Sequence, residues 1–275
     1  MMMARTLHAA GLGTMAGFLL AGATVVAADG PPAMTSPVNT LLAQGYLARE
    51  ALPDSLSILP APPAEGSAAL ARDREASKAG LALGKSARWA LATADADLRS
   101  PAATGAFSCA AGFEISPQAT PAIDRLMRRS LPDLGLATYG VKERYKRARP
   151  FMENGEANCS PDYTEMLRKD GSYPSGHSAI GFGWGLMLAE VVPDRAARLV
   201  ARGVAFGDSR RICNVHWLSD VEQGRLMGAA VVARLHADPG FQADLQAAKA
   251  EAAAARSTAP SRNCTQEEAA LAPQP

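Results

Sequence analysis

The sequence predicts an all-α protein built as a single-domain helical bundle. Long stretches rich in alanine and leucine, such as residues 67–97, carry interspersed charges in a pattern that suits amphipathic helices. No run of alternating β-branched residues stands out, so no strand is predicted. Of the 275 residues, 48% are hydrophobic, which is enough for one sizeable core, and no internal repeat is visible.

The first 27 residues are predicted to be a secretory signal peptide. Arg5 precedes an apolar stretch from Leu12 to Val26, and small residues around Ala27 form a cleavage site. A membrane anchor is the alternative, but the apolar run is short and no basic segment follows it. We therefore expect a periplasmic protein whose mature form carries no membrane anchor.

After the signal peptide, residues 28–66 are predicted to form an extended, proline-rich lead-in with a short helix around residues 41–47. A helical catalytic domain is predicted over residues 67–240, and a C-terminal helix and tail over residues 241–275. The first elements of the domain are expected to be one long helix or two shorter ones over 67–97, a loop over 101–112, and helices over 120–130 and 134–148.

The second half of the domain is predicted to hold a central apolar helix over residues 178–192. A polar loop with one helical turn at residues 163–168 precedes it. Asp194 is the expected cap of a helix ending at Phe206, and the last core helix is expected over residues 216–237.

The four cysteines predict two disulfides, because an even count in an exported chain favours pairing. Three pairings are possible. We expect Cys109 with Cys159, which both lie in predicted loops, and Cys213 with Cys264. A zinc site is the alternative, but no Cys-x-x-Cys spacing supports it.

The charge distribution argues against a nucleic-acid partner. The formal net charge is +1, and lysines and arginines form no long basic run. A nucleic-acid-binding protein would normally concentrate them in a patch.

The octet at residues 171–178, Gly-Ser-Tyr-Pro-Ser-Gly-His-Ser, opens directly into the central apolar helix. Unpaired backbone N–H groups and the helix dipole make such an N-terminus a site for an anion. Gly176 allows a close backbone approach, Ser175 offers a hydroxyl, and His177 titrates near neutrality. Ordinary turn and capping chemistry is the alternative.

Two further segments supply cations. Lys142 and Arg149 are seven residues apart, so on one helix they would share a face and could reach one anion. Ser209 and Arg210 follow a glycine and an acidic residue, which predicts a turn where Arg210 could bind phosphate oxygens. Taken singly, solvated surface positions are the alternative for both segments.

His216 and Asp220 form the last pair. At this spacing the carboxylate can bond one imidazole nitrogen and leave the other free as a nucleophile. A surface His–Asp pair or a core histidine is the alternative.

In chain order these segments read Lys-x6-Arg-Pro, Pro-Ser-Gly-His and Ser-Arg-x5-His-x3-Asp. This order resembles the signature of the type 2 phosphatidic acid phosphatase superfamily, which includes the vanadium haloperoxidases. The stretches at 169–178 and 207–221 resemble the class A bacterial non-specific acid phosphatases, and the likeness extends over about residues 105–235. The resemblance implies the all-α fold of that group and homo-oligomers.

The same resemblance implies a function and a role for each residue. The expected reaction is the hydrolysis of small phosphomonoesters with no metal and no cofactor, with phosphate or vanadate as inhibitors and with phosphate transfer to alcohols as a side reaction. His216 would attack phosphorus, Asp220 would orient it, and His177 would protonate the leaving alcohol, which predicts an acidic optimum. The expected phosphate-binding residues are Lys142, Arg149, Ser175, Gly176 and Arg210.

Other functions remain as alternatives. A vanadium haloperoxidase would hold vanadate at the same site, although this chain is short for that group. A lipid phosphatase with the same chemistry is another alternative. It would not be embedded in the membrane, because no mature apolar run reaches ~20 residues. A phosphate-binding protein would need the cations but neither histidine.

Two positions depart from the class A pattern. Ser178 stands where threonine is usual, and Asn214 stands where glycine is frequent, close to the pocket. The loop over residues 151–169 is expected to shape the leaving-group side of the pocket.

Overall fold

The computed structural model describes residues 45–272, which all belong to one compact unit. The predicted signal peptide and most of the predicted helix at 41–47 lie outside these residues. The described residues are helical and contain no strand, which confirms the all-α prediction. Among them, no helix combines the length and the apolar character that crossing a membrane requires.

The helices follow one another in the order of the chain. The first half holds η1 (Arg49–Ala51), α2 (Ser55–Ile58), α3 (Ala68–Leu81), α4 (Ala87–Ala94), η2 (Ala103–Phe107), α5 (Ser108–Ala111), α6 (Pro121–Leu136) and α7 (Tyr139–Tyr145). The second half holds α8 (Pro150–Asn154), η3 (Pro161–Tyr163), α9 (Thr164–Lys169), α10 (Gly176–Val191), η4 (Pro193–Arg195), α11 (Ala196–Ile212), α12 (Leu218–Leu235), α13 (Pro239–Ala255) and α14 (Cys264–Leu271).

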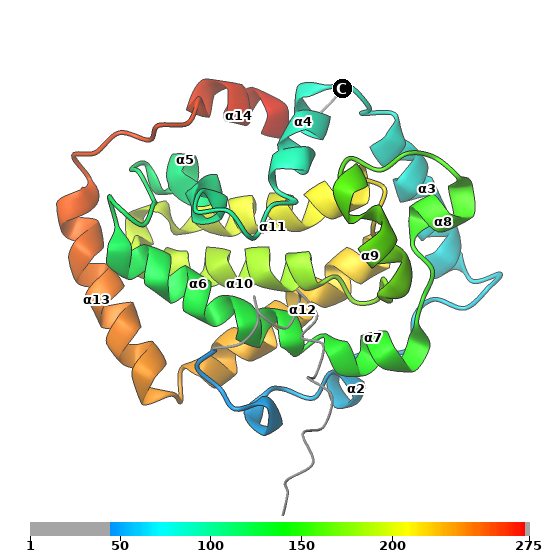
Figure 1. Cartoon of the computed structure of the whole chain (residues 1–275), viewed down its shortest axis with the longest axis horizontal. Coiled ribbons are helices and arrows are strands. Elements are labelled where there is room, and N and C mark those ends of the chain that lie inside the picture. The colour runs from blue at the N-terminus through cyan, green and yellow to red at the C-terminus, as the bar shows by residue number, and fades with distance from the viewer. Residues whose placement is uncertain (1–44, 273–275) are drawn as a thin grey trace, which may run out of the picture. The chain divides into compact units, whose positions relative to one another are not determined.

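The core is organised around α10, the predicted central helix. It lies between α11 and α12, and α6 packs across it (Figure 1). Glycines make this packing close: a Cβ atom at Gly224 of α12 would collide with the carbonyl oxygen of Ser175, and one at Gly228 would lie 2.5 Å from that of Ala179. The start of α12 is therefore held against the start of α10, where the predicted site residues lie.

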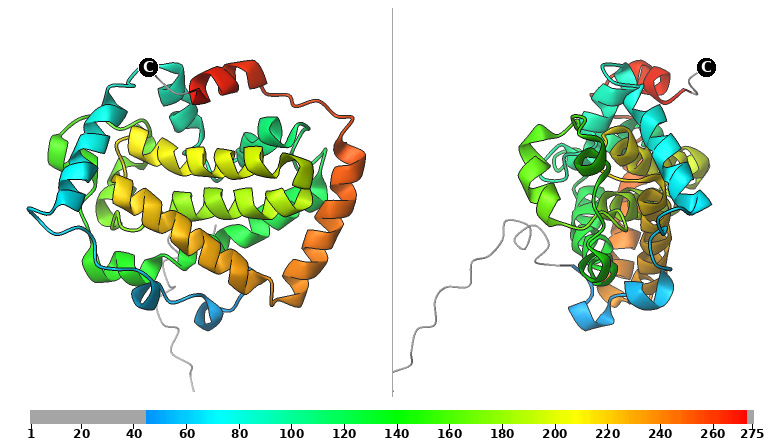
Figure 2. Two further views of the ribbon diagram at one scale, coloured as in Figure 1. Left: turned by 180° about the vertical axis from the view of Figure 1, so that it is seen from behind. Right: turned by 90° about the vertical axis from the view of Figure 1, so that its right-hand side faces the viewer.

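The C-terminal helices complete the unit. Helix α13 packs along α6 and buries Phe241, Leu245 and Ala248, and α14 packs against α4 (Figures 1 and 2). The lead-in is also attached, because the hydroxyl of Tyr173 donates to the carbonyl of Pro60 (2.9 Å).

Both predicted cysteine pairings are wrong, although two disulfides are present. Cys109 pairs with Cys264, and Cys159 pairs with Cys213. Helix α14 returns to the neighbourhood of α5 and brings the first pair within 5.3 Å (Cα–Cα). The loop before η3 runs beside the end of α11, where the backbone N–H of Cys159 donates to the carbonyl of Cys213 (3.2 Å).

Several predicted helix limits also differ from the structure. The stretch at 67–97 forms two helices, α3 and α4, and the predicted loop at 101–112 contains η2 and α5. Helix α6 continues through Pro132 to Leu136 rather than ending at Ser130. The predicted helix over 134–148 is replaced by the end of α6 and by α7, which stops at Tyr145 because Lys146 adopts a left-handed conformation (φ 42°).

Candidate active site

The predicted site residues gather around one cavity of about 160 Å³ between α7, α9, α10 and the end of α11. Six of them line it: Lys142, Arg149, Gly176, His177, Arg210 and His216. The other two, Ser175 and Asp220, are fully buried behind the cavity wall. They contact each other, because the backbone N–H of Ser175 donates to the backbone carbonyl of Asp220 (2.9 Å).

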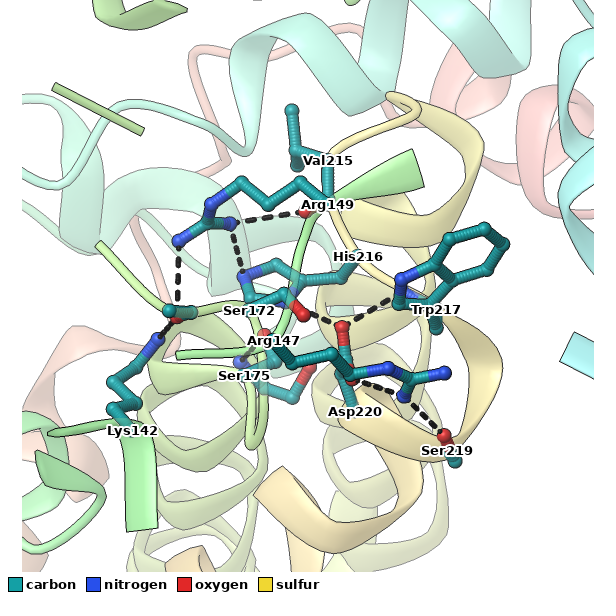
Figure 3. Close-up of polar contacts among 12 residues, drawn as sticks. Lys142, Arg147, Arg149, Ser172, Ser175, Val215, His216, Trp217, Ser219 and Asp220 are labelled. Atoms are coloured by element: carbon teal, nitrogen blue, oxygen red, sulfur yellow. Dashed lines mark hydrogen bonds and ion pairs between the residues drawn. The ribbon is translucent and has the colours of Figure 1, made fainter. Parts of the chain in front are cut away.

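His216 is buried between a carboxylate and a guanidinium (Figure 3). Its Nδ1 lies 3.2 Å from Oδ2 of Asp220, and its Nε2 lies 3.0 Å from Nη1 of Arg149. An arginine can only donate, so Nε2 accepts and the proton is on Nδ1. Burial, together with the charges of Arg149 and Lys142, lowers the pKa of His216 well below 6.5. The imidazole is therefore neutral, and its Nε2 accepts from a guanidinium that also lines the cavity.

The His216–Asp220 pair does not sit on one helix face as the spacing suggested. Helix α12 begins only at Leu218, with Trp217 as its N-cap. Oδ2 of Asp220 also accepts the backbone N–H of Trp217 (2.9 Å), as in the carboxylate half of a capping box. The start of the helix thus fixes the carboxylate, and the carboxylate fixes the imidazole.

Asp220 has a second buried partner that the sequence did not indicate. Nη1 of Arg147 donates to its Oδ1 (2.7 Å), and Nη2 of Arg147 donates to Asp73 on α3 (2.8 Å). Asp73 also accepts the N–H and the hydroxyl of Ser219. Burial raises the pKa of Asp220, and the charge of Arg147 opposes that rise. Arg147 and Asp73 are therefore positioning residues behind the histidine.

The side chains of Lys142 and Arg149 converge on one point, but the two residues do not share a helix as predicted. Arg149 follows the break at Lys146 and is the extended N-cap residue of α8. Both side chains are buried, and both donate to Oδ2 of Asp170, at 3.3 Å and 3.0 Å. Asp170, to which no role was assigned from the sequence, holds the two cations at the cavity wall.

Arg210 is the least satisfied charge at the site. It lies in the last turn of α11, not in the predicted turn, and is 1% exposed. Its Nε has no hydrogen-bond partner, and among the described residues its guanidinium forms no ion pair with a carboxylate. Burial, reinforced by the charge of Arg149, lowers its pKa to about 9. A bound anion would offset both effects.

The start of α10 adds backbone donors to these cations. The side chain of Ser175 caps the helix by accepting the N–H of Ser178 (3.2 Å). Within residues 45–272, the N–H groups of Gly176 and His177 have no acceptor. They lie at the positive end of the helix dipole and can bind an anion.

His177 is held by one bond that decides which nitrogen is free. Its Nε2 lies 3.1 Å from the carbonyl of Ala96, and its ring stacks on Phe206 (6.5 Å between centroids). A carbonyl can only accept, so Nε2 carries a proton and Nδ1 remains for chemistry. Burial and the charge of Arg210 lower the pKa of His177 well below 6.5.

Other features of the sequence analysis fall outside the cavity. Asn214 has φ 62°, a conformation that favours glycine or asparagine, and its side chain is bonded to Asn154 and to the carbonyl of Glu156. It anchors the loop after α8 and does not line the cavity. In the part of the chain that the structure describes, no cluster of three His, Cys, Asp or Glu side chains is placed to hold a metal ion.

The chain is similar to known proteins over most of its length. A family model described as the PAP2 superfamily matches residues 134–242. The chain is 41% identical over 207 residues to a non-specific acid phosphatase of Providencia stuartii, covering 75% of this chain and 84% of that protein. It is 40% identical over 210 residues to an acid phosphatase of Zymomonas mobilis, covering 75% and 78%. A non-specific acid phosphatase of Salmonella typhimurium is 41% identical over 194 residues, covering 70% and 78%.

Proposed function

The chain belongs to the bacterial non-specific acid phosphatases of the PAP2 superfamily, and from this premise we propose that its cavity hydrolyses phosphomonoesters through a phosphohistidine on His216. The observation that carries the proposal is the placement of Nε2 of His216. This Nε2 accepts an N–H of Arg149, which lines the cavity, and Asp220 bonds the opposite nitrogen. This is the arrangement of a neutral, oriented nucleophile.

Around this nucleophile, the site is organised for the charge of a phosphoryl group. Arg210 lacks an anionic partner, the N–H groups of Gly176 and His177 lack acceptors, and Lys142 and Arg149 share one carboxylate. Catalysis of phosphoryl transfer depends mainly on positioned positive charge and on alignment of the nucleophile. These groups would bind the non-bridging oxygens more tightly as charge develops in the transition state.

The proposed reaction has two steps, formation and hydrolysis of the phosphohistidine. In the first, Nε2 of His216 forms a bond to phosphorus, the bond from phosphorus to the ester oxygen breaks, and Nδ1–H of His177 gives its proton to that oxygen. In the second, Nδ1 of His177 takes a proton from water, the water oxygen bonds to phosphorus, and the N–P bond breaks. An alcohol in place of water would give a new phosphomonoester, so we include phosphotransfer in the proposal.

We propose that the protein acts in the periplasm without a membrane anchor. Both described disulfides use all four cysteines of the chain, which suits an oxidising compartment. The predicted signal peptide would provide export.

The test of the proposed function is hydrolysis of p-nitrophenyl phosphate at pH 5 to 6 by the mature chain from Ala28 with intact disulfides. Turnover should persist in EDTA and should be blocked by vanadate, which mimics the pentacoordinate transition state. Tight vanadate binding without turnover would contradict the proposal and would favour a haloperoxidase or a phosphate-binding protein. A bromide-dependent peroxidase assay would then separate those two.

The role of His177 predicts a dependence on both pH and leaving group. Because its pKa lies below 6.5, its protonated form accumulates only at acidic pH, and kcat/KM should fall as the pH rises above that pKa. His177→Asn should remove this alkaline decline. It should lower kcat by about 10²-fold or more for an alkyl phosphate, but by only about tenfold for p-nitrophenyl phosphate, whose leaving group needs little protonation. Equal losses for the two substrates would contradict the role of general acid.

A further inference from the structure

The cavity contains a second region that the phosphate-binding residues do not explain. Its buried floor is formed by Arg149, Arg210 and His216. Its solvent side is lined by Arg99 and Met166, which are exposed, together with Tyr163. When a phosphoryl group occupies the floor, the remainder of the ester must extend past these side chains.

Arg99 is held in place without being neutralised. Its guanidinium carbon lies 5.4 Å from the ring centroid of Tyr163, and its Nη2 lies 3.9 Å from the sulfur of Met166. Its backbone N–H donates to Oδ1 of Asp97 (2.8 Å), which fixes the loop that carries it. Stacking on an aromatic ring orients a guanidinium and leaves its N–H groups free to donate in the plane.

In the described part of the chain, some exposed arginines pair with a carboxylate and others, such as Arg144 and Arg234, do not, so what distinguishes Arg99 is its place at the cavity. Arg72 forms an ion pair with Glu222, Arg74 pairs with Glu65, and Arg256 pairs with Asp194. Within the described ranges, the guanidinium of Arg99 forms no ion pair with a carboxylate. It is therefore a cation without a counter-charge, at the solvent side of the cavity that we propose to bind the phosphoryl group.

We propose that Arg99, Tyr163 and Met166 form a leaving-group subsite that selects phosphomonoesters with a flat, apolar leaving group bearing a second anionic group. This rests on the proposed function, which fixes the end of the cavity where phosphate binds. Tyr163 and Met166 contact the apolar body of the leaving group. Arg99 donates two parallel hydrogen bonds to the carboxylate or second phosphate of the leaving group. An exposed ion pair of this kind contributes a few-fold preference that salt weakens.

The test compares two aryl phosphates of equal shape, 4-carboxyphenyl phosphate and the neutral 4-carbamoylphenyl phosphate. The measured quantity is the ratio of their kcat/KM values, in the unsubstituted protein and in Arg99→Gln. Differences in leaving-group reactivity cancel when the two ratios are compared. The ratio should fall about fivefold in Arg99→Gln, through KM of the carboxylate substrate, while kcat for the carbamoyl substrate stays unchanged. In 0.5 M salt the two proteins should become similar.

Arg72→Gln is the matched control, because it removes one exposed arginine that does not line the cavity. An unchanged ratio in Arg99→Gln would overturn the subsite. An equal fall in Arg72→Gln would also overturn it, by showing a general effect of net charge. If the unsubstituted protein hydrolysed neither substrate, the proposed function itself would fail, and the subsite with it.

Discussion

Replacing His216 with alanine should lower kcat for p-nitrophenyl phosphate by about 10⁴-fold or more, because the substitution removes the group that bonds to phosphorus. The imidazole is bonded to Arg149 and Asp220, and each of these side chains keeps another ionic partner when the imidazole is removed, Asp170 and Arg147 respectively. The fold should therefore survive, and phosphate should still bind to the three cations of the cavity. Steady-state kinetics and phosphate binding by calorimetry would measure the two effects separately.

A covalent trap makes this prediction more specific. Acid-labile, alkali-stable radioactivity from a labelled substrate should remain on the unsubstituted protein after rapid quenching, and none should remain on His216→Ala. His236→Ala is the matched control, since His236 lies at the C-terminal end of α12, is bonded to Glu190 and does not line the cavity. Full turnover by His216→Ala would exclude the phosphohistidine, and loss of phosphate binding would show that the substitution had disturbed the cavity.

Removing the disulfide between Cys109 and Cys264 is expected to cost about 5 kcal/mol of unfolding free energy, because it closes a separation of 155 residues. Removing the one between Cys159 and Cys213, which are 54 residues apart, should cost about 4 kcal/mol. Paired Cys→Ala substitutions and urea unfolding would measure both values in the same buffer.

The two disulfides should differ more in catalysis than in stability. Nη1 of Arg210 lies 4.0 Å from Sγ of Cys213, so loss of that pair changes the surroundings of a phosphate-binding cation. Below the unfolding transition, the Cys159/Cys213 double variant should show a raised KM, and the Cys109/Cys264 variant should keep the original KM. The reverse pattern would mean that α14, rather than the end of α11, governs the site.

The sequence predicted those site residues that belong to compact motifs. The octet does open into the central helix, which begins at Gly176 with Ser175 as its cap, two residues before the predicted start at Ser178, because a helix start is a local property of a few neighbouring residues. Asp170, Arg147 and Asp73 were assigned no role from the sequence. Asp73 and Arg147 are 74 residues apart, and they meet where both bond to Ser219 at the start of α12.

Local backbone breaks account for the other errors. Nothing in the run from 134 to 148 marks Lys146 as the residue with positive φ, so the spacing of Lys142 and Arg149 suggested a shared helix face. The two side chains meet because the chain turns back toward Asp170, not because they are two helical turns apart. In the same way, four cysteines allow three pairings, and only the return of α14 to α5 distinguishes them.

The disulfides are nested, since the pair of Cys159 and Cys213 lies inside the segment that Cys109 and Cys264 enclose. This sets a requirement on biosynthesis. When a chain emerges from its N-terminus, Cys109 and Cys159 become available before their true partners. A disulfide between Cys109 and Cys159 would have to be exchanged before the native pairs can form. The exchange requires attack by a free thiolate on that disulfide. We therefore expect efficient production to require a disulfide isomerase as well as an oxidant, and a strongly oxidising refolding buffer without a thiol to trap the pairs of consecutive cysteines.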